Sequence, residues 1–460
     1  MLPDGARDRF EDAVGPLGCL DSPEDLRLYA YDGGVDTHPP DLVLFPRSVE
    51  DVSAIARIAH ELRIPLVARG AATGLSGGSI PCQGGVVVAF ARMNRILEID
   101  LENECAIVEP GVVNLHITEA VEDQGYFFAP DPCSRRACTI GGNVAENSGG
   151  VHAPAYGVTT NHVLGLEFVL PGGAIVQTGG KEPDLPGYDL TGLLTGSEGA
   201  IALVTKIIVR LTRKPEAVRT ALAVYDSVED AVRSVAEIAN QGIAPAALEM
   251  FDGPILRIVE EATHAGYPAD ASAVLLVDLA GGREQVKEQV ERVREACLLS
   301  GPRKFRVART PKERDPLWKG RYDALGAVGR LSPAYCVPDG VVPRSEIAGA
   351  LAFIAEVSRR HGLSIGRIVH AADGALEPVI LFDPRRPGDP EKARAAAEEI
   401  LGHCIRVGGS ITGGHGIGME KVNLMGQLFS RESLAMMRNL QLAFDPGGIM
   451  NPGKVLPAAG

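Results

Sequence analysis

A loop rich in glycine and hydroxyl side chains spans residues 69–79, with the sequence Arg-Gly-Ala-Ala-Thr-Gly-Leu-Ser-Gly-Gly-Ser. Small residues let backbone N–H groups approach a pyrophosphate closely, and hydroxyl groups supply further donors. Arg69 would add a positive charge. One such loop also fits a plain tight turn. It is not a Rossmann fingerprint, because Ala72 occupies the first glycine position and no helix pattern follows.

Two more loops of small residues occur in the same half of the chain, at 130–150 and 196–200. Three loops of this kind favour a large, polar, extended ligand. An isoalloxazine ring needs hydrogen-bond donors beside N1, O2 and N5, and backbone amides can provide them. The loops are therefore candidates for a flavin-dinucleotide site.

The first loop also contains the pattern G-x-S-x-G at residues 74–78. In serine hydrolases this pattern needs a helix immediately after the serine. The following Ser79-Ile80-Pro81 argues against a helix. The sequence context therefore disfavours a hydrolase.

Two side chains outside the loops could take part in chemistry. His415 lies in the run Gly-Gly-His-Gly-Ile-Gly at 413–418. The flanking glycines leave its imidazole able to reach a ligand, and an ordinary pKa of about 6.5 suits a general base. Arg321 follows Trp318 by three residues, and its guanidinium could bind a carboxylate through two hydrogen bonds. The alternatives are a structural histidine and a solvated arginine.

The elements that must position these residues alternate in the first half of the chain. Ser48 can cap a helix whose apolar residues recur at helical spacing up to Leu62. A second helix is expected at 115–124, with Gly125 as the stop. Short strands are expected at 64–68, 85–90, 96–99, 106–108, 164–170 and 200–211.

The glycine loops stop near residue 214. Two strand–helix–strand patterns follow, which suggest a ferredoxin-like plate. Ser227 can cap the first helix of this region. The glycine-rich signature returns at 408–418 and 445–454, so the C-terminus is expected to complete the first domain. We expect domains at 1–215 and 216–405, with a C-terminal segment at 406–460.

The 460-residue chain carries a net charge of −14, which disfavours non-specific binding to nucleic acid. None of its 8 cysteines forms a C-x-x-C pair, so a zinc ribbon or a bound iron–sulfur cluster is not expected. No stretch approaches the length of a membrane span. We expect a cytoplasmic protein, whose association with the inner membrane, where it occurs, is peripheral or through a partner.

From about residue 46 to 457, the chain resembles the FAD-linked oxidases of the vanillyl-alcohol oxidase/p-cresol methylhydroxylase superfamily. It is most similar to the branch of the GlcD-like flavoproteins of glycolate oxidase, of D-lactate dehydrogenase and of D-2-hydroxyglutarate dehydrogenase. The resemblance is carried by 68–78, 130–150, 192–199, 317–321, 370–378, 409–421 and 444–454.

The resemblance implies an α+β fold, with a two-subdomain FAD-binding domain of the p-cresol methylhydroxylase (PCMH) type and a ferredoxin-like cap. It implies FAD held without a covalent bond, because residues 70–79 contain no histidine. His415 matches the family's base, and Arg321 and His370 complete the expected catalytic set. The expected cofactor-binding residues are Arg69, Gly70, Ala72, Thr73, Gly74, Leu75, Ser76, Gly77, Gly78, Pro130, Asp131, Thr139, Gly141, Gly142, Asn143, Asn147, Ser148, Gly149, Gly150, Glu198, Gly199, Ile201 and Asn451.

The chain departs from the family pattern at the metal site of its metal-dependent members. Their ligands lie at the positions of His370, Glu377 and Gly414. This chain keeps the histidine, has glutamate where relatives have histidine, and has lost the glutamate at 414. Either a His/Glu metal site survives with His415 nearby, or the metal is lost and Glu377 is an ordinary acid.

The resemblance implies oxidation of a small 2-hydroxy acid, with hydride transfer to flavin N5. The first alternative is a flavin-binding subunit with weakened catalysis that serves assembly of a larger dehydrogenase complex. The second is an oxidase of sugar or aromatic alcohols. The electron acceptor is expected to be external, such as an iron–sulfur subunit or a quinone, in a homodimer or a hetero-oligomer.

Overall fold

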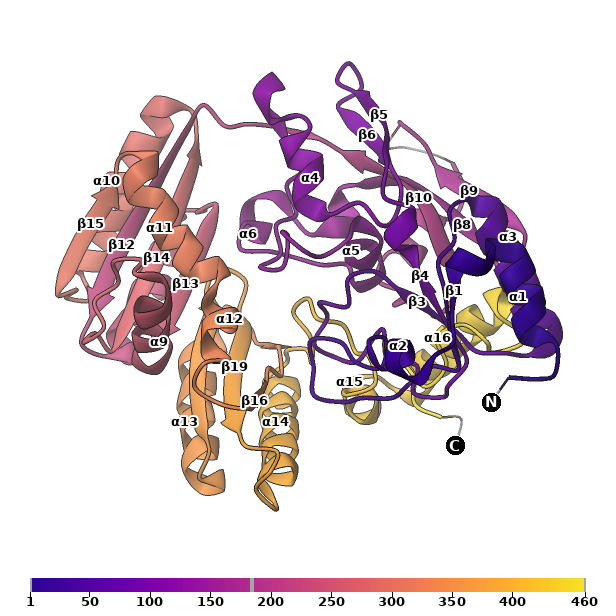
Figure 1. The fold of residues 1–460 in the computed structure, drawn as a ribbon. Helices are drawn as coiled ribbons and strands as arrows, with labels where there is room; N and C mark the ends of the chain where they lie inside the picture. Colours follow the sequence, from indigo (N-terminus) through magenta and orange to yellow (C-terminus); the bar gives the residue numbers. More distant parts are fainter. Residues whose placement is uncertain (1, 183–185, 459–460) are drawn as a thin grey trace. The chain divides into compact units, whose positions relative to one another are not determined.

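The computed structural model describes residues 2–182 and 186–458, which form two compact units (Figure 1). Unit 1 comprises Met1–Gly149, Gly157–Arg213 and Gly414–Gly460. Unit 2 comprises Gly150–Tyr156 and Lys214–Gly413. The short segment 150–156 therefore leaves one unit and packs in the other. These two units are compact bodies and differ from the domains expected from the sequence at 150–156 and 406–413. The functional domains at 1–215, 216–405 and 406–460 therefore remain a prediction.

The first sheet of unit 1 positions the loop at 69–79. Its order is β1 (Cys19–Leu20), β2 (Leu42–Leu44), β4 (Val86–Ala89) and β3 (Leu66–Arg69), with the last three parallel. The crossover helix α3 (Val49–Leu62) begins where the sequence predicts, because Ser48 Oγ accepts a hydrogen bond from the Asp51 N–H at 3.2 Å. Strand β3 leads directly into the glycine loop.

The second sheet of unit 1 is antiparallel, in the order β5 (Ile96–Asp100), β6 (Cys105–Val108), β10 (Leu203–Arg210), β8 (Val163–Val169) and β9 (Ile175–Gly179). The helix expected at 115–124 is divided into α4 (Asn114–Glu119) and η3 (Glu122–Gln124), because Val121 has a non-helical φ of −126°. Gly125 ends it with a φ of 81°, as predicted.

Further helices of unit 1 are α1 (Ala6–Val14), α2 (Pro23–Arg27), α5 (Ile140–Glu146), α7 (Leu190–Leu194), α15 (Met425–Leu428) and α16 (Arg431–Phe444). A short pair of strands, β7 (Tyr126–Phe127) and β11 (Thr212–Arg213), completes this unit. The one-turn helix α6 (Ala153–Tyr156) belongs to unit 2.

The sheet of unit 2 is antiparallel, in the order β15 (Lys304–Ala308), β12 (Ala217–Tyr225), β14 (Ala273–Gly281), β13 (Ala247–Asp252), β18 (Ser364–His370), β19 (Ala375–Phe382) and β16 (Ala334–Cys336). Strand β17 (Gly340–Val341) also pairs with β19. The first four strands, with α8 (Val228–Asn240) and α10 (Arg283–Leu298), form the ferredoxin-like plate predicted from the sequence.

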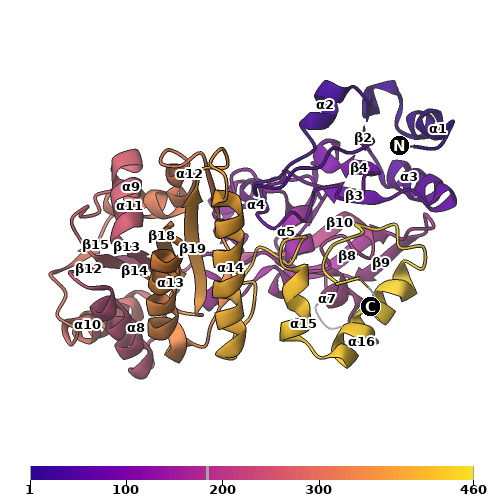
Figure 2. The same ribbon diagram turned by 90° about the horizontal axis from the view of Figure 1, so that it is seen from below.

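Helices cover both faces of this sheet (Figure 2). One face packs against α8, α10, α13 (Ile347–His361) and α14 (Asp389–Arg406) in a large apolar core. The other face lies under α9 (Gly253–Thr263), α11 (Pro311–Tyr322) and α12 (Ala324–Val328). Glu249 and Asp278 point to this second face, because their neighbours along the strands belong to the apolar core on the first face.

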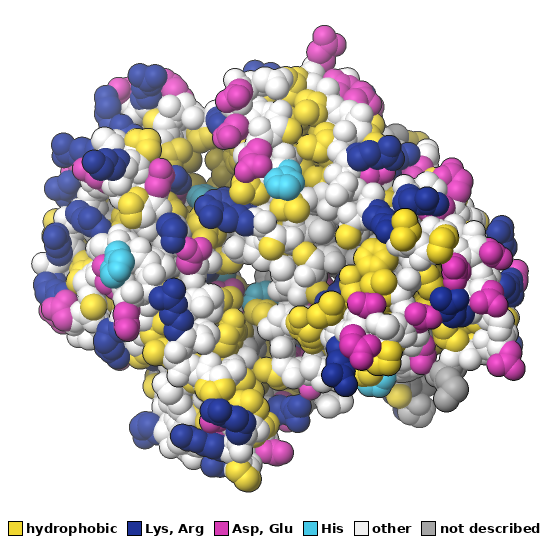
Figure 3. All heavy atoms as spheres, in the orientation of Figure 1, with side chains coloured by type: hydrophobic (Ala, Val, Ile, Leu, Met, Phe, Trp, Pro, Cys, Tyr) yellow, Lys and Arg dark blue, Asp and Glu magenta, His cyan; other side chains and the backbone are white. Residues whose placement is uncertain are grey.

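Two surface properties bear on partners. Within the described residues, every helix is too short or too polar to cross a membrane. On the face drawn in Figure 3, basic and acidic side chains are interspersed. That face therefore lacks the basic stripe that a nucleic-acid-binding surface requires.

Candidate active site

The first two glycine loops meet in unit 1. A Cβ at Gly70 would lie 2.2 Å from Thr139 Oγ1, and one at Gly78 would lie 2.7 Å from Glu146 Oε1. Thr139 in turn caps α5 by accepting a hydrogen bond from the Gly142 N–H at 3.3 Å. A side chain at Gly70 would therefore displace Thr139, and one at Gly78 would force the Glu146 carboxylate to move.

The third loop is attached to the same helix. The Gly196 N–H donates to Val144 O at 2.8 Å, and the Glu198 N–H donates to Ala145 O at 2.9 Å. Glu198 has a φ of 51°, a left-handed conformation that is uncommon for a residue other than glycine. The three loops that the sequence singles out thus converge.

Asn451 joins the loops to the C-terminal segment. Its Nδ2 donates to Gly78 O at 2.9 Å and to Glu198 O at 2.7 Å, and its Oδ1 accepts a hydrogen bond from Lys454 Nζ at 2.9 Å. Lys454 is buried and also donates to Ile80 O at 2.6 Å. The sequence analysis named Asn451 as a cofactor-binding residue, which remains a prediction, and did not name Lys454.

The Glu198 carboxylate holds the segment that carries His415. It accepts hydrogen bonds from the backbone N–H groups of Ile417 and Gly418, each at 2.7 Å. His415 is half-buried in unit 1, and the flanking Gly416 has a φ of 77°. The predicted base is therefore attached to the same frame as the glycine loops.

Several predicted cofactor residues use their side chains inside the protein. Arg69 places its guanidinium over the Tyr29 ring, 5.3 Å from the centroid. Asn143 Oδ1 accepts a hydrogen bond from Asn114 Nδ2 at 2.8 Å, and Asn147 Oδ1 accepts one from the Thr160 N–H at 2.8 Å. The side chains of these residues shape the loops, so contact with a cofactor through them remains a prediction.

The remaining predicted residues lie at three kinds of place. Ile201 is 8% exposed and lies in an apolar core of unit 1. Asp131 forms an ion pair with Arg135, with 3.8 Å between Oδ2 and Nη1. Gly150 begins the segment that belongs to unit 2. The others belong to the loops that converge in unit 1, namely Ala72, Thr73, Gly74, Leu75, Ser76, Gly77, Pro130, Gly141, Ser148, Gly149 and Gly199.

In unit 2, Arg321 and His370 come together as the sequence led us to group them. Arg321 is 0% exposed, and its Nη2 lies 3.3 Å from His370 Nε2. Glu249 binds both, with Arg321 Nε to Glu249 Oε2 at 2.5 Å and His370 Nδ1 to Glu249 Oε1 at 2.8 Å. Glu377 approaches from the next strand, 3.4 Å from Arg321 Nη2 and 3.5 Å from His370 Nε2. We call these four residues the ion cluster.

The strands explain why the ion cluster forms. Glu249 on β13 lies directly opposite His370 on β18, and Glu377 lies on β19 opposite Ile368 of β18. Burial lowers the pKa of His370, but the carboxylates of Glu249 and Glu377 outweigh it and raise this pKa well above its ordinary value. The cluster thus pairs two cations with two carboxylates.

This arrangement does not fit the divalent-ion site of metal-dependent relatives. The Arg321 guanidinium already lies beside His370 Nε2 and Glu377, the two groups that would face the metal ion. A second cation there would be repelled by Arg321. Among the described residues, no group of three His, Cys, Asp or Glu side chains is placed to hold a metal ion.

Sequence reasoning missed Glu249, which is 1% exposed. A signal was present, because it is an acid within the apolar strand sequence Ala-Leu-Glu-Met-Phe. Charged residues are almost never fully buried unless they are paired. An acid on a buried strand therefore predicts a partner, although it does not say which one.

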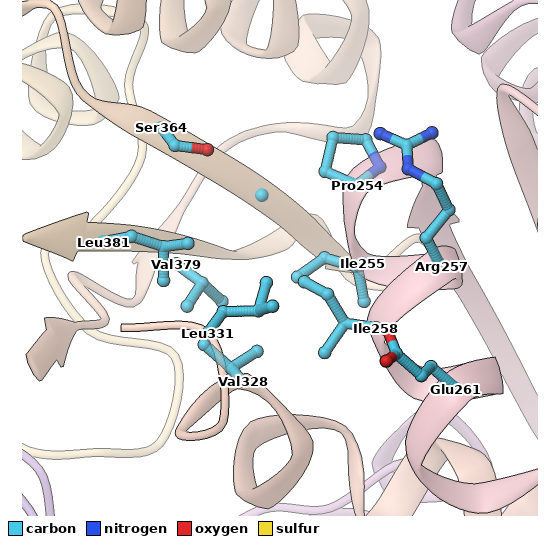
Figure 4. A pocket seen from close by; sticks show the side chains of 11 residues that line it. Pro254, Ile255, Arg257, Ile258, Glu261, Val328, Leu331, Ser364, Val379 and Leu381 are labelled. Carbon is cyan, nitrogen blue, oxygen red and sulfur yellow. The ribbon is translucent and has the colours of Figure 1, made fainter. Parts of the chain in front are cut away.

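A separate open pocket of about 340 Å³ lies farther along the same sheet face (Figure 4). It is bordered by Ile255 and Ile258 of α9 and by Val379 of β19, with Arg257 and Glu261 at the side of the helix. Neither Arg321 nor His370 lines it. The pocket is therefore distinct from the ion cluster.

The chain also matches known families over most of its length. Residues 40–179 match the family described as FAD binding domain, and residues 214–455 match FAD linked oxidases, C-terminal domain. The chain belongs to the FAD-linked oxidases.

Relatives of this oxidoreductase cover nearly the whole chain. It is 43% identical to the glycolate oxidase subunit GlcD of Escherichia coli (strain K12), over 96% of this chain and 89% of the relative. It is 40% identical to GlcD of Bacillus subtilis (strain 168), over 99% of this chain and 97% of the relative. A probable mitochondrial D-lactate dehydrogenase of Danio rerio is 32% identical, over 91% and 84%.

Solved structures show the same fold. A p-cresol methylhydroxylase superposes with a TM-score of 0.84 at 20% identity, covering 98% of each chain. The 4-ethylphenol oxidase of Gulosibacter chungangensis gives a TM-score of 0.82 at 22% identity, covering 100% of this chain and 99% of the other. The expected PCMH-type fold is confirmed.

FAD is the cofactor of this FAD-linked oxidoreductase, and non-covalent binding is usual for its branch. The three glycine loops that converge in unit 1, which we call the cradle, fit such a group. Gly70 leaves no room for a side chain beside Thr139, and Ala72 and Gly77 have positive φ values of 53° and 77°. Backbone in such conformations can present N–H groups to phosphate oxygens.

Proposed function

We propose that this chain oxidises a small 2-hydroxy acid of the glycolate, D-lactate or D-2-hydroxyglutarate class to the 2-oxo acid. The observation that carries the proposal is the ion cluster, in which Arg321 and His370 lie 3.3 Å apart, in a chain 43% identical to a glycolate oxidase subunit. Two adjacent cationic donors suit a carboxylate, which would take the place of Glu377, the more distant of their two acidic partners at 3.4 and 3.5 Å.

The reaction removes a proton from the substrate hydroxyl and a hydride from its α-carbon. FAD, when bound, accepts the hydride. His415 takes the hydroxyl proton, a role that an imidazole nitrogen can fill as a general base. Arg321 and His370 hold the carboxylate end, while Glu249 fixes both side chains through its two oxygens.

A turnover assay with product analysis tests this function. The purified holoenzyme is supplied with each acid and an artificial electron-accepting dye, and the product is identified as the 2-oxo acid. His415→Ala should lower turnover by about 10²–10⁴-fold while FAD stays bound. The matched control is His60→Ala, because His60 is an exposed histidine on α3. Normal turnover of His415→Ala would exclude its role as base.

A second candidate is a flavin-binding subunit with weakened catalysis and an assembly role. It is favoured by the two carboxylates of the ion cluster, which already balance Arg321 and His370. The relatives named as subunits also suit a hetero-oligomer. The electron acceptor is then external, an iron–sulfur subunit or a quinone. Bound FAD without oxidation of any 2-hydroxy acid would support this candidate.

A further inference from the structure

Asp278 is a second buried carboxylate on the face of the unit 2 sheet that carries Glu249. It lies on β14, where it faces Ala247 of β13, two residues before Glu249. Only 1% of its side chain is exposed. The proposed chemistry does not use Asp278, so its burial calls for another explanation.

The Asp278 carboxylate receives hydrogen bonds from four side chains. Oδ1 accepts from the Thr220 hydroxyl and from Trp318 Nε1, the latter at 3.1 Å. Oδ2 accepts from Arg314 Nη2 at 2.6 Å and contacts His152 Nε2 at 3.2 Å. These donors come from β12, helix α11 and the segment 150–156. A single carboxylate thereby connects three separate parts of unit 2.

Helix α11 has an internal weak point that this carboxylate spans. Pro316 lies inside the helix, where it has no N–H to donate to the carbonyl of residue 312. Arg314 lies two residues before Pro316 and Trp318 two residues after it. Since both donate to Asp278, the carboxylate holds together the two halves of a helix that its own backbone joins poorly.

We infer that Asp278 is a positioning residue for Arg321, because it fastens helix α11 across Pro316 and joins it to the segment 150–156. Arg314, Trp318 and Arg321 are spaced by four and three residues and therefore share one face of α11. Asp278 holds the first two, and Glu249 holds the third. This inference rests on the proposed role of Arg321 in holding the substrate carboxylate.

His152 extends the connection to the segment after the second glycine loop. Its ring lies 5.2 Å from the Trp318 ring, with 36° between the planes, and its Nε2 faces Asp278. The predicted cofactor residues 147–149 directly precede this segment in the chain. Asp278 thus anchors, on one side chain, the helix that carries Arg321 and the chain that leaves the glycine loop.

The matched control is Asp252, a buried aspartate of the neighbouring strand β13. It pairs with Arg367 Nε at 2.8 Å and caps α9 by accepting from the Ile255 N–H at 3.2 Å, so it has a similar environment without donors from α11. Asp278→Asn and Asp252→Asn both weaken a buried ion pair. Only Asp278→Asn weakens the link between Arg314 and Trp318, which lie on either side of Pro316.

Hydrogen exchange measured by mass spectrometry on the FAD-loaded enzyme tests the inference. In Asp278→Asn, amides in 311–322 and 150–156 should exchange about tenfold faster or more, and the KM for the hydroxy acid should rise about tenfold with a smaller change in kcat. In Asp252→Asn, exchange in these segments and KM should stay as in the wild type. Equal acceleration in both variants, or no acceleration in α11, would overturn the inference.

Arg314→Met gives a second test if Asp278→Asn does not fold. The Arg314 side chain is 30% exposed, so its loss should be tolerated, and faster exchange should appear in α11 before Pro316. Unchanged exchange there would contradict the fastening. If the wild type oxidises no 2-hydroxy acid, the proposed function fails, while the exchange data still decide whether Asp278 fastens α11.

Discussion

Glu249 is the residue on which the ion cluster depends most. Its two oxygens bind Arg321 and His370, and all three side chains are largely buried. Glu249→Gln keeps the shape but removes the charge that balances Arg321. We expect a loss of about 3–5 kcal/mol in the free energy of unfolding, measured by urea denaturation, because a buried charge would be poorly compensated.

The control for that change is Glu261→Gln, since Glu261 is exposed on α9 of the same unit. It should alter the free energy of unfolding by less than about 0.5 kcal/mol. Equal effects of the two substitutions would show that Glu249 is not the centre of the cluster.

Lys454 offers a test of the cradle at the residue scale. Its ammonium group donates to Gly78 O, Ile80 O and Asn451 Oδ1. Lys454→Met would leave these acceptors without that donor, so we expect weaker FAD binding and a loss of about 1–3 kcal/mol in stability. Titration of the apoprotein with FAD measures the first, and urea denaturation the second.

The matched change is Lys392→Met on α14, where the lysine is largely exposed. An affinity for FAD that is as high in Lys454→Met as in this control would rule out a role of Lys454 in shaping the cradle.

Among the elements, the first glycine loop is the most sensitive to the size of a side chain. A Cβ at Gly70 would lie 2.2 Å from Thr139 Oγ1, which also caps α5. Gly70→Ala should therefore separate the first two loops and lower the FAD content of the purified protein. Gly349→Ala on α13 is the control, because a Cβ there meets nothing within 4 Å. Full FAD content in Gly70→Ala would contradict the convergence of the loops.

Asp278 on strand β14 should make the free energy of unfolding depend on pH. Burial opposes the charge of Asp278, but the hydrogen bond from His152 and the charges of Arg314 and His152 outweigh it and lower the pKa of Asp278 below 3.8. A lowered folded-state pKa stabilises the fold above the unfolded pKa, and this contribution is lost as pH falls through the folded value.

Urea denaturation at a series of pH values measures this effect. The stability advantage of the wild type over Asp278→Asn should shrink as pH falls below about 4, where Asp278 takes up a proton in the native state. A difference between the two proteins that stays constant down to the lowest pH at which both fold would show that Asp278 is not ionised in the native state.

Elements with strong local signals could be predicted from the sequence, whereas contacts between distant residues could not. Ser48 and Ser227 cap α3 and α8 as expected, because an N-cap depends only on neighbouring residues. The glycine loops revealed the cradle through their composition. Glu249 and Asp278 were missed, because their partners lie 72 and 36 residues or more along the chain. Helix α11 could not be predicted from the sequence, because it contains Pro316 and a proline usually ends a helix.

At the scale of the whole molecule, we expect this FAD-linked oxidoreductase to work without a divalent ion. The Arg321 guanidinium already balances Glu377 and lies beside His370, so we expect less than about 0.1 equivalent of metal in the purified holoenzyme, measured by plasma mass spectrometry. EDTA should leave turnover unchanged. A stoichiometric divalent ion that EDTA removes together with activity would contradict this reading of the ion cluster.

The most direct test of the central claim is anaerobic reduction of the bound flavin by candidate substrates. The holoenzyme is mixed without oxygen with glycolate, D-lactate, L-lactate and D-2-hydroxyglutarate in turn, and the flavin band at about 450 nm is followed. We predict that one of the 2-hydroxy acids bleaches this band and that Arg321→Ala requires a higher concentration of the same acid. A bound flavin that none of these acids reduces would contradict the claim.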